Sequence, residues 1–182
     1  MGKKFFVIVE GVETGAQRCL VQMIRDIGQT KVSSPEECDY FLVFCPVVSR
    51  VAADISGALA RVPANKPGIL VVLHHTSDAN LALAESSRQV HDLNVILTVD
   101  FLFWNDDLLD SSCNNKSWNL IQNHLGCSKN SVKIKNIHKK HQDFHDSLQT
   151  EQEVKLFCLC LLINLFYCVI IIIMQTNSMI MT

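Results

Sequence analysis

The acidic side chain best placed to do chemistry in this sequence is Asp54, near the start of a predicted helix. It follows the segment 49–53, SRVAA, which leads out of an apolar run, so its carboxylate would lie near the end of a strand. A carboxylate in that place could stabilise the positive charge that develops on a sugar ring during glycosidic cleavage. The simpler alternative, which we favour, is an acid that stabilises the helix dipole by about 0.3–1 kcal/mol.

Other polar side chains are predicted to lie at the same edge of the sheet. Ligands of parallel α/β sheets bind in the crevice outside the carboxyl ends of the strands. The residues at these ends are Glu10, Cys45, Ser49, His74, His75, Asp78 and Asp100. Any such fold has polar residues where strands run into loops, so ordinary loop chemistry is the simpler explanation of this set.

The histidines do not match a metal-binding pattern. His74 and His75 are adjacent, so their side chains would face opposite ways on a strand. Three more histidines would share one face of a helix but have no fourth ligand nearby: His138, His141 and His145. We predict no metal site.

The glycines and cysteines do not indicate a cofactor site either. The segment Gly11–Gly15 matches neither the dinucleotide-binding nor the P-loop pattern, and Glu10 and Glu13 would repel a phosphate group. Cys45 precedes a proline and has no evident base except His74 on another strand. We predict no cofactor.

Alternating apolar and amphipathic segments predict an α/β fold, a three-layer sandwich. Strands are predicted at Lys3–Glu10, Thr30–Ser33, Tyr40–Phe44, Ile69–Leu73 and Val95–Phe103. Helices are predicted at Ala16–Ile27, Ala52–Arg61, Leu83–Asp92 and Ser117–Leu125. Because strands joined by crossover helices run parallel, we expect a five-stranded parallel sheet with the flavodoxin-like order 2-1-3-4-5.

Composition limits the class of protein. The chain has 182 residues and a formal net charge of −2, which argues against a nucleic-acid binder. The cysteines before residue 130 show no CxxC spacing, and the N-terminus has too short an apolar run for a signal peptide. Residues 1–126 therefore indicate a Rossmann-like domain that faces the cytosol.

The C-terminal residues predict a membrane anchor. Residues 127–155 form a basic polar linker, and Leu156–Met174 is an apolar run of 19 residues without a charged side chain. A helix of that length spans about 29 Å, close to the hydrocarbon thickness of a bilayer. Residues 175–182 would form a short tail beyond the single span. Residues 127–182 as a whole do not continue the upstream periodicity, and a protein without them would be cytosolic.

The lysines place the domain on the cytosolic side. They lie between Lys129 and Lys155, before the span, and no Lys or Arg follows it. The positive-inside bias then keeps the N-terminal domain in the cytosol, as in tail-anchored proteins. Asn164 within the span could pair with its copy in a dimer, so a homo-oligomer is possible.

Several strings support a resemblance over residues 4–125. FCPVVSR, KPGILVVLHHT and VILTVDFLFW resemble a group of short uncharacterised vertebrate α/β proteins. At the level of fold, the domain is similar to Toll/interleukin-receptor and nucleoside deoxyribosyltransferase domains, in which a carboxylate after a central strand cleaves an N-glycosidic bond. Asp54 falls near that position, but those families use Glu, and Val51-Ala52 replaces a Trp-Cys pair. A more distant similarity is to BRCT domains, through the string 99–104, VDFLFW.

These observations lead to two hypotheses of different classes. The first is a membrane-tethered module without enzymatic activity that acts through protein contacts with unknown partners. The alternative is a nucleotide or NAD N-glycosidase that uses Asp54.

Overall fold

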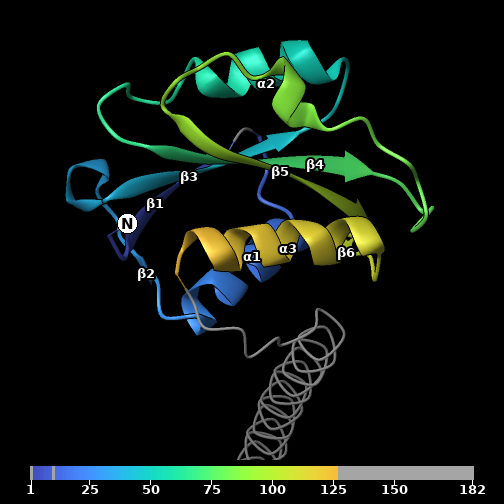
Figure 1. Cartoon of the computed structure of the whole chain (residues 1–182), viewed down its shortest axis with the longest axis horizontal. Coiled ribbons are helices and arrows are strands. Elements are labelled where there is room, and N and C mark those ends of the chain that lie inside the picture. Colours follow the sequence, from blue (N-terminus) through green and yellow to red (C-terminus); the bar gives the residue numbers. More distant parts are fainter. Residues whose placement is uncertain (1, 10, 127–182) are drawn as a thin grey trace, which may run out of the picture. The chain divides into compact units, whose positions relative to one another are not determined.

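The computed structural model describes residues 2–9 and 11–126, which form an alternating α/β domain (Figure 1). The elements in chain order are β1 Lys4–Val9, α1 Gly15–Asp26, β2 Thr30–Lys31, the 3-10 helix η1 Pro35–Glu37, β3 Tyr40–Pro46, α2 Val51–Leu59, β4 Gly68–His75, the 3-10 helix η2 Ser86–Gln89, β5 Val95–Trp104, β6 Asp107–Leu108 and α3 Ser112–His124.

The strands of the described residues form one sheet of order β2-β1-β3-β4-β5-β6. Strands β1 to β5 pair in parallel, which confirms the predicted order 2-1-3-4-5. The prediction of five strands was wrong, because β6 pairs antiparallel with the end of β5. Asn105 and Asp106 make the tight turn between them with positive φ angles of 47° and 73°. Asn and Asp tolerate this conformation better than most residues, and it allows a two-residue hairpin.

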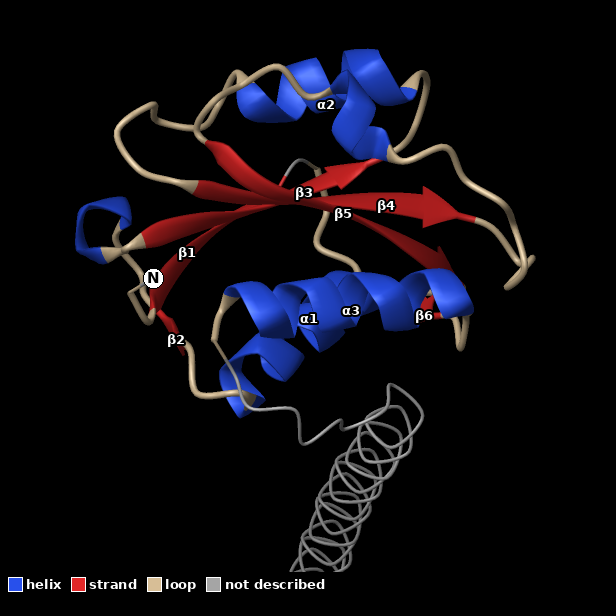
Figure 2. Ribbon diagram, viewed as in Figure 1, coloured by secondary structure: helices blue, strands red, loops and turns tan. Residues whose placement is uncertain are grey.

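Helices cover both faces of the sheet, as the three-layer prediction requires. Figure 2 shows α1 and α3 on one face and α2 with η2 on the other. Two separate groups of buried side chains match these layers, one including Leu20, Phe101 and Trp118 and the other Ile55 and Val72. Strands β3 and β4 contribute to both groups, which explains why their sequences are continuous apolar runs.

The connection from β4 to β5 differs from the prediction. No α-helix forms at 83–92; the described chain has only the short turn η2 there, beginning at Ser86. The Ser86 N–H donates to the carboxylate of Asp100 instead of taking part in a longer helix. The Asp100 carboxylate thus serves as the acceptor for the first N–H group of η2.

The two long helices on the α1 face begin at polar caps. Thr14 accepts from the Gln17 N–H, and the Gln17 side chain accepts from the Thr14 N–H, which is a capping box. Ser111 accepts from the Asn114 N–H, so α3 begins before the predicted Ser117. At Gly15 an added Cβ would lie 2.6 Å from the Asp106 carbonyl oxygen, so this glycine lets α1 approach the β5–β6 turn.

Within residues 2–9 and 11–126, no helix is long and apolar enough to cross a membrane. The predicted span Leu156–Met174, the linker 127–155 and the tail 175–182 lie outside the described residues.

Candidate functional site

Both oxygens of the Asp54 carboxylate accept hydrogen bonds from the loop that precedes its own helix. Its Oδ2 accepts from the backbone N–H groups of Val48 and Ser49 at 2.9 Å each, and its Oδ1 accepts from the Ser49 hydroxyl at 2.9 Å. These bonds, the Ser49 N–H above all, hold the pKa of the Asp54 carboxyl below its ordinary value against the opposing effect of burial. The carboxylate therefore fixes the β3–α2 loop and is not aimed at an open crevice.

We expect Asp54→Ala to lower the free energy of unfolding by about 1 kcal/mol, because the loop N–H groups of Val48 and Ser49 lose their acceptor. The Asp54→Asn variant keeps one oxygen acceptor and should lose less. Urea denaturation of the full chain in nonionic detergent measures both values. Equal stability of wild type and Asp54→Ala would contradict this structural role.

His74 and Asp100 form a second polar pair, on neighbouring strands. Asp100 Oδ1 lies 2.9 Å from His74 Nε2, and the two side chains are 12% and 10% exposed. An ionised carboxylate can only accept, so Nε2 carries the hydrogen. Burial acts to raise the pKa of the Asp100 carboxyl, but hydrogen bonds from His74 and Ser86 outweigh it and leave that pKa below its ordinary value.

The other predicted crevice residues lie apart. His75 is exposed and stacks on Trp104 with ring centroids 4.7 Å apart, which confirms that it faces away from His74. Cys45 is completely buried, so its thiol does not line an open crevice. Asp78 accepts from the Asn80 N–H inside its own loop.

Hydrogen bonds between the side chains of the described residues join the predicted crevice residues in pairs and not in one cluster. Ser49 meets Asp54, His74 meets Asp100, and the others have separate surroundings. Glu10 lies outside the described residues. No group of three His, Cys, Asp or Glu side chains that could hold a metal ion occurs within residues 2–9 and 11–126.

The outer edge of β5 is the more open feature. Successive residues of a strand direct their N–H and C=O groups to opposite sides. The Phe103 carbonyl accepts from Thr76 on the β4 side, whereas Leu102 bonds outward to the Asn114 amide. By this alternation Thr98 and Asp100 also direct their backbone groups outward. Within the described chain, the outward N–H of each and the Thr98 C=O have no hydrogen-bond partner.

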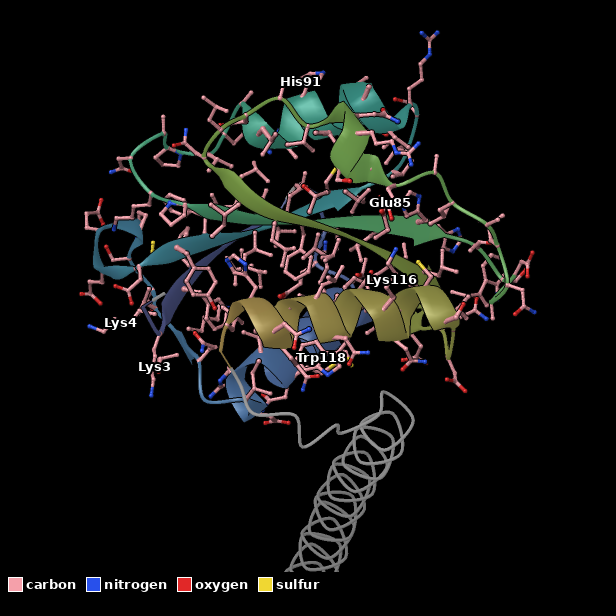
Figure 3. The ribbon with its side chains drawn as sticks, viewed as in Figure 1. Lys3, Lys4, Glu85, His91, Lys116 and Trp118 are labelled. Carbon is pink, nitrogen blue, oxygen red and sulfur yellow. The ribbon has the colours of Figure 1, made fainter. Side chains whose placement is uncertain are left out.

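A hollow of about 660 Å³ lies along this edge. One wall is the loop 81–87 and the other is α3, with Thr98, Val99 and Asp100 of β5 as the floor. We call this hollow the β5 groove. Two exposed leucines flank it, Leu81 on the loop and Leu120 on α3. Figure 3 shows Glu85 and Lys116, one from each wall, directed toward one another.

A second hollow, of about 890 Å³, lies where β2 pairs with only two residues of β1. Polar and charged side chains of α1 and β2, including Arg25, Asp26 and Lys31, contribute much of its lining. None of the exposed large apolar side chains of the described chain lines it. The β5 groove combines free backbone groups with exposed apolar side chains, and so it is the better candidate site.

The groove was missed at the level of sequence because its two walls, the loop 81–87 and α3, are separated from its floor on β5 by stretches of chain that show no local pattern linking them. One signal was present. In the predicted order 2-1-3-4-5, the last strand lies at an edge, and an edge strand leaves one row of backbone groups free. Comparison with known proteins adds no family: no protein-family model, curated protein or solved structure matches this chain.

Proposed function

We propose that residues 4–125 form a protein-interaction module that binds an extended peptide segment of another protein along the outer edge of β5. The module faces the cytosol and is held at a membrane by the span Leu156–Met174. Binding of this kind adds a strand to a sheet, with main-chain hydrogen bonds supplying affinity and flanking side chains supplying selectivity.

The observation that carries the proposal is the free edge of β5 inside a two-walled groove. Exposed edge strands are usually paired, covered or charged in folded proteins. Here the Thr98 N–H and C=O and the Asp100 N–H lie open between the loop 81–87 and α3. A single extended segment satisfies those groups, and its side chains then contact Leu81 on one wall and Leu120 on the other.

The structure does not favour the N-glycosidase alternative, because the Asp54 oxygens already accept three hydrogen bonds. The full chain in detergent, incubated with NAD and with a panel of nucleosides, should release no free base detectable by chromatography. Base release that Asp54→Ala abolishes would overturn the interaction module and favour the enzyme.

Selection from a phage library of random peptides tests the groove. An extended peptide rises roughly 3.3 Å per residue, so peptides of about ten residues are longer than the open edge of β5. We expect the full chain in detergent to enrich peptides with apolar residues at alternate positions. Thr98→Pro removes only an outward N–H and leaves the β4 ladder intact, so it should abolish binding while the domain stays folded.

The matched control is Thr98→Val, which keeps the N–H and the strand preference and should bind as wild type does. Circular dichroism and urea denaturation establish that Thr98→Pro remains folded. Peptides that bind Thr98→Pro as well as wild type would refute binding at the β5 edge.

Membrane topology gives an independent prediction. The full chain should resist carbonate extraction from membranes, and an N-terminal tag should be digested by protease added to intact membranes. Replacing four residues of Leu156–Met174 by Lys should release the protein into the soluble fraction, since each charge at the centre of a span costs about 2.5–3.5 kcal/mol. A tag protected from protease would contradict the cytosolic orientation.

A further inference from the structure

An exposed ion pair joins the two walls of the β5 groove. Lys116 Nζ on α3 lies 2.9 Å from Glu85 Oε1 at the start of η2, and the side chains are 66% and 54% exposed (Figure 3). Lys116 lowers the pKa of the Glu85 carboxyl, and Glu85 raises the pKa of the Lys116 ammonium. Both groups are therefore charged at neutral pH.

The pair stands over the Asp100 end of the groove. Ser86, which follows Glu85, donates its N–H to the Asp100 carboxylate, and Ser117, which follows Lys116, donates its hydroxyl to the Asp100 carbonyl. Because Ser86 and Ser117 both bond to Asp100, they place Glu85 and Lys116 on opposite sides of the β5 edge. A strand that reaches the Asp100 N–H must displace the ion pair.

We propose that the Glu85–Lys116 pair is a charge gate that selects the peptide bound in the β5 groove. The occupant is an extended segment of another protein with an acidic and a basic residue at neighbouring positions and apolar residues two positions from each. This inference rests on the function proposed above and names the chemistry of its partner.

The alternation of a strand explains this pattern. Neighbouring side chains of the added strand face opposite walls. An acid that faces α3 pairs with Lys116, and the basic neighbour faces the loop and pairs with Glu85. Residues two positions away return to the same walls, where Leu120 and Leu81 offer apolar contacts.

The exchange of partners makes the gate selective. An exposed ion pair contributes little to stability, so opening it opposes binding only weakly. A peptide with the matching charge order replaces the single Glu85–Lys116 ion pair with two ion pairs, one on each wall. In the register that the apolar contacts to Leu81 and Leu120 hold, a peptide with the two charges in the reverse order places like charges against both walls, which disfavours binding.

A second copy of the chain fits this site less well. Its own β5 edge lies between the same two walls, so pairing of two β5 edges would bring the walls of both copies against one another. A single extended segment has no such walls, and this is the reason to assign the groove to a peptide of a partner protein.

The experiment exchanges the charges of the two walls. The double variant Glu85→Lys/Lys116→Glu and the wild type, both as full chains in detergent, are used to select from the same phage library of random peptides. We expect the neighbouring charges of the enriched peptides to appear in opposite order for the two proteins. A synthetic peptide chosen by the wild type should bind the double variant about tenfold more weakly. Arg88→Gln, a charge change on η2 outside the groove lining, should bind as wild type does.

The possible failures of the two proposals differ. Enriched peptides that need the Thr98 N–H but carry the same charge order, or none, for both proteins would overturn the gate and leave the peptide groove standing. If no enriched peptide loses binding to Thr98→Pro, the groove itself is overturned and the gate with it. A wild-type dimer that Thr98→Pro converts to a monomer would place a second copy in the groove and overturn the partner assigned here.

Discussion

Asn114→Ala should lower the free energy of unfolding by about 3 kcal/mol, a large part of the 5–15 kcal/mol typical of a domain. The Asn114 side chain is completely buried. Its Oδ1 accepts from the Leu102 N–H at 2.7 Å, and its Nδ2 donates to the carbonyls of Leu102 and Leu109 at 2.8 and 2.7 Å. Alanine would leave the Leu102 N–H and the Leu109 C=O without these partners, at about 1–3 kcal/mol each.

The reason for so large an effect is the place of Asn114 in the fold. Its amide acts as a short strand, since it satisfies both backbone groups of Leu102 where β5 has no full-length neighbour on that side. It also ties α3 to the turn after β6. Asn114→Asp should be as destabilising as Asn114→Ala, because a carboxylate accepts from Leu102 but cannot donate to the two carbonyls.

Asn115→Ala is the matched control for this prediction. Asn115 is next in α3, partly buried, and donates one side-chain bond to the Ser111 carbonyl. Its loss should cost less than about 1 kcal/mol. Urea denaturation of the full chains in nonionic detergent compares the variants. If Asn114→Ala and Asn115→Ala are equally stable, the amide does not hold the edge of β5.

Asp100→Asn should lower the free energy of unfolding by about 2 kcal/mol at pH 7, because the amide cannot accept both the His74 and Ser86 hydrogen bonds in the same geometry and loses the charge that strengthens them. The folded-state pKa of the Asp100 carboxyl is depressed. The stabilisation is therefore fully present above the unfolded value of about 3.9 and is lost as the pH falls through the lower folded value.

The expected signature is a difference that depends on pH. The gap in unfolding free energy between wild type and Asp100→Asn should stay constant from pH 7 to about pH 5 and narrow below about pH 4. Asp78→Asn is the control, because Asp78 makes a local turn that Asn also makes. A gap for Asp100→Asn that widens on acidification would show that the ionised carboxylate destabilises the fold.

Much of the architecture follows from local patterns in the sequence. The continuous apolar runs of β3 and β4 predict strands buried on both faces, and the structure confirms them. The helix α1 and the order of the first five strands also agree with the prediction. These features depend on the spacing of apolar side chains over a few residues and on the handedness of crossover connections, both of which are present in the sequence itself.

The role of each polar side chain was decided by tertiary structure. The sequence by itself determined that Asp54 follows a strand and that His74 and His75 face opposite ways. Only the folded chain determined that Asp54 holds its own loop and that Asp100 pairs with His74, 26 residues away. It also brought the loop 81–87 against α3 and left the edge of β5 open between them. The physical reason is that periodicity records which side of an element faces the core, whereas a hydrogen bond or a groove depends on which distant elements meet.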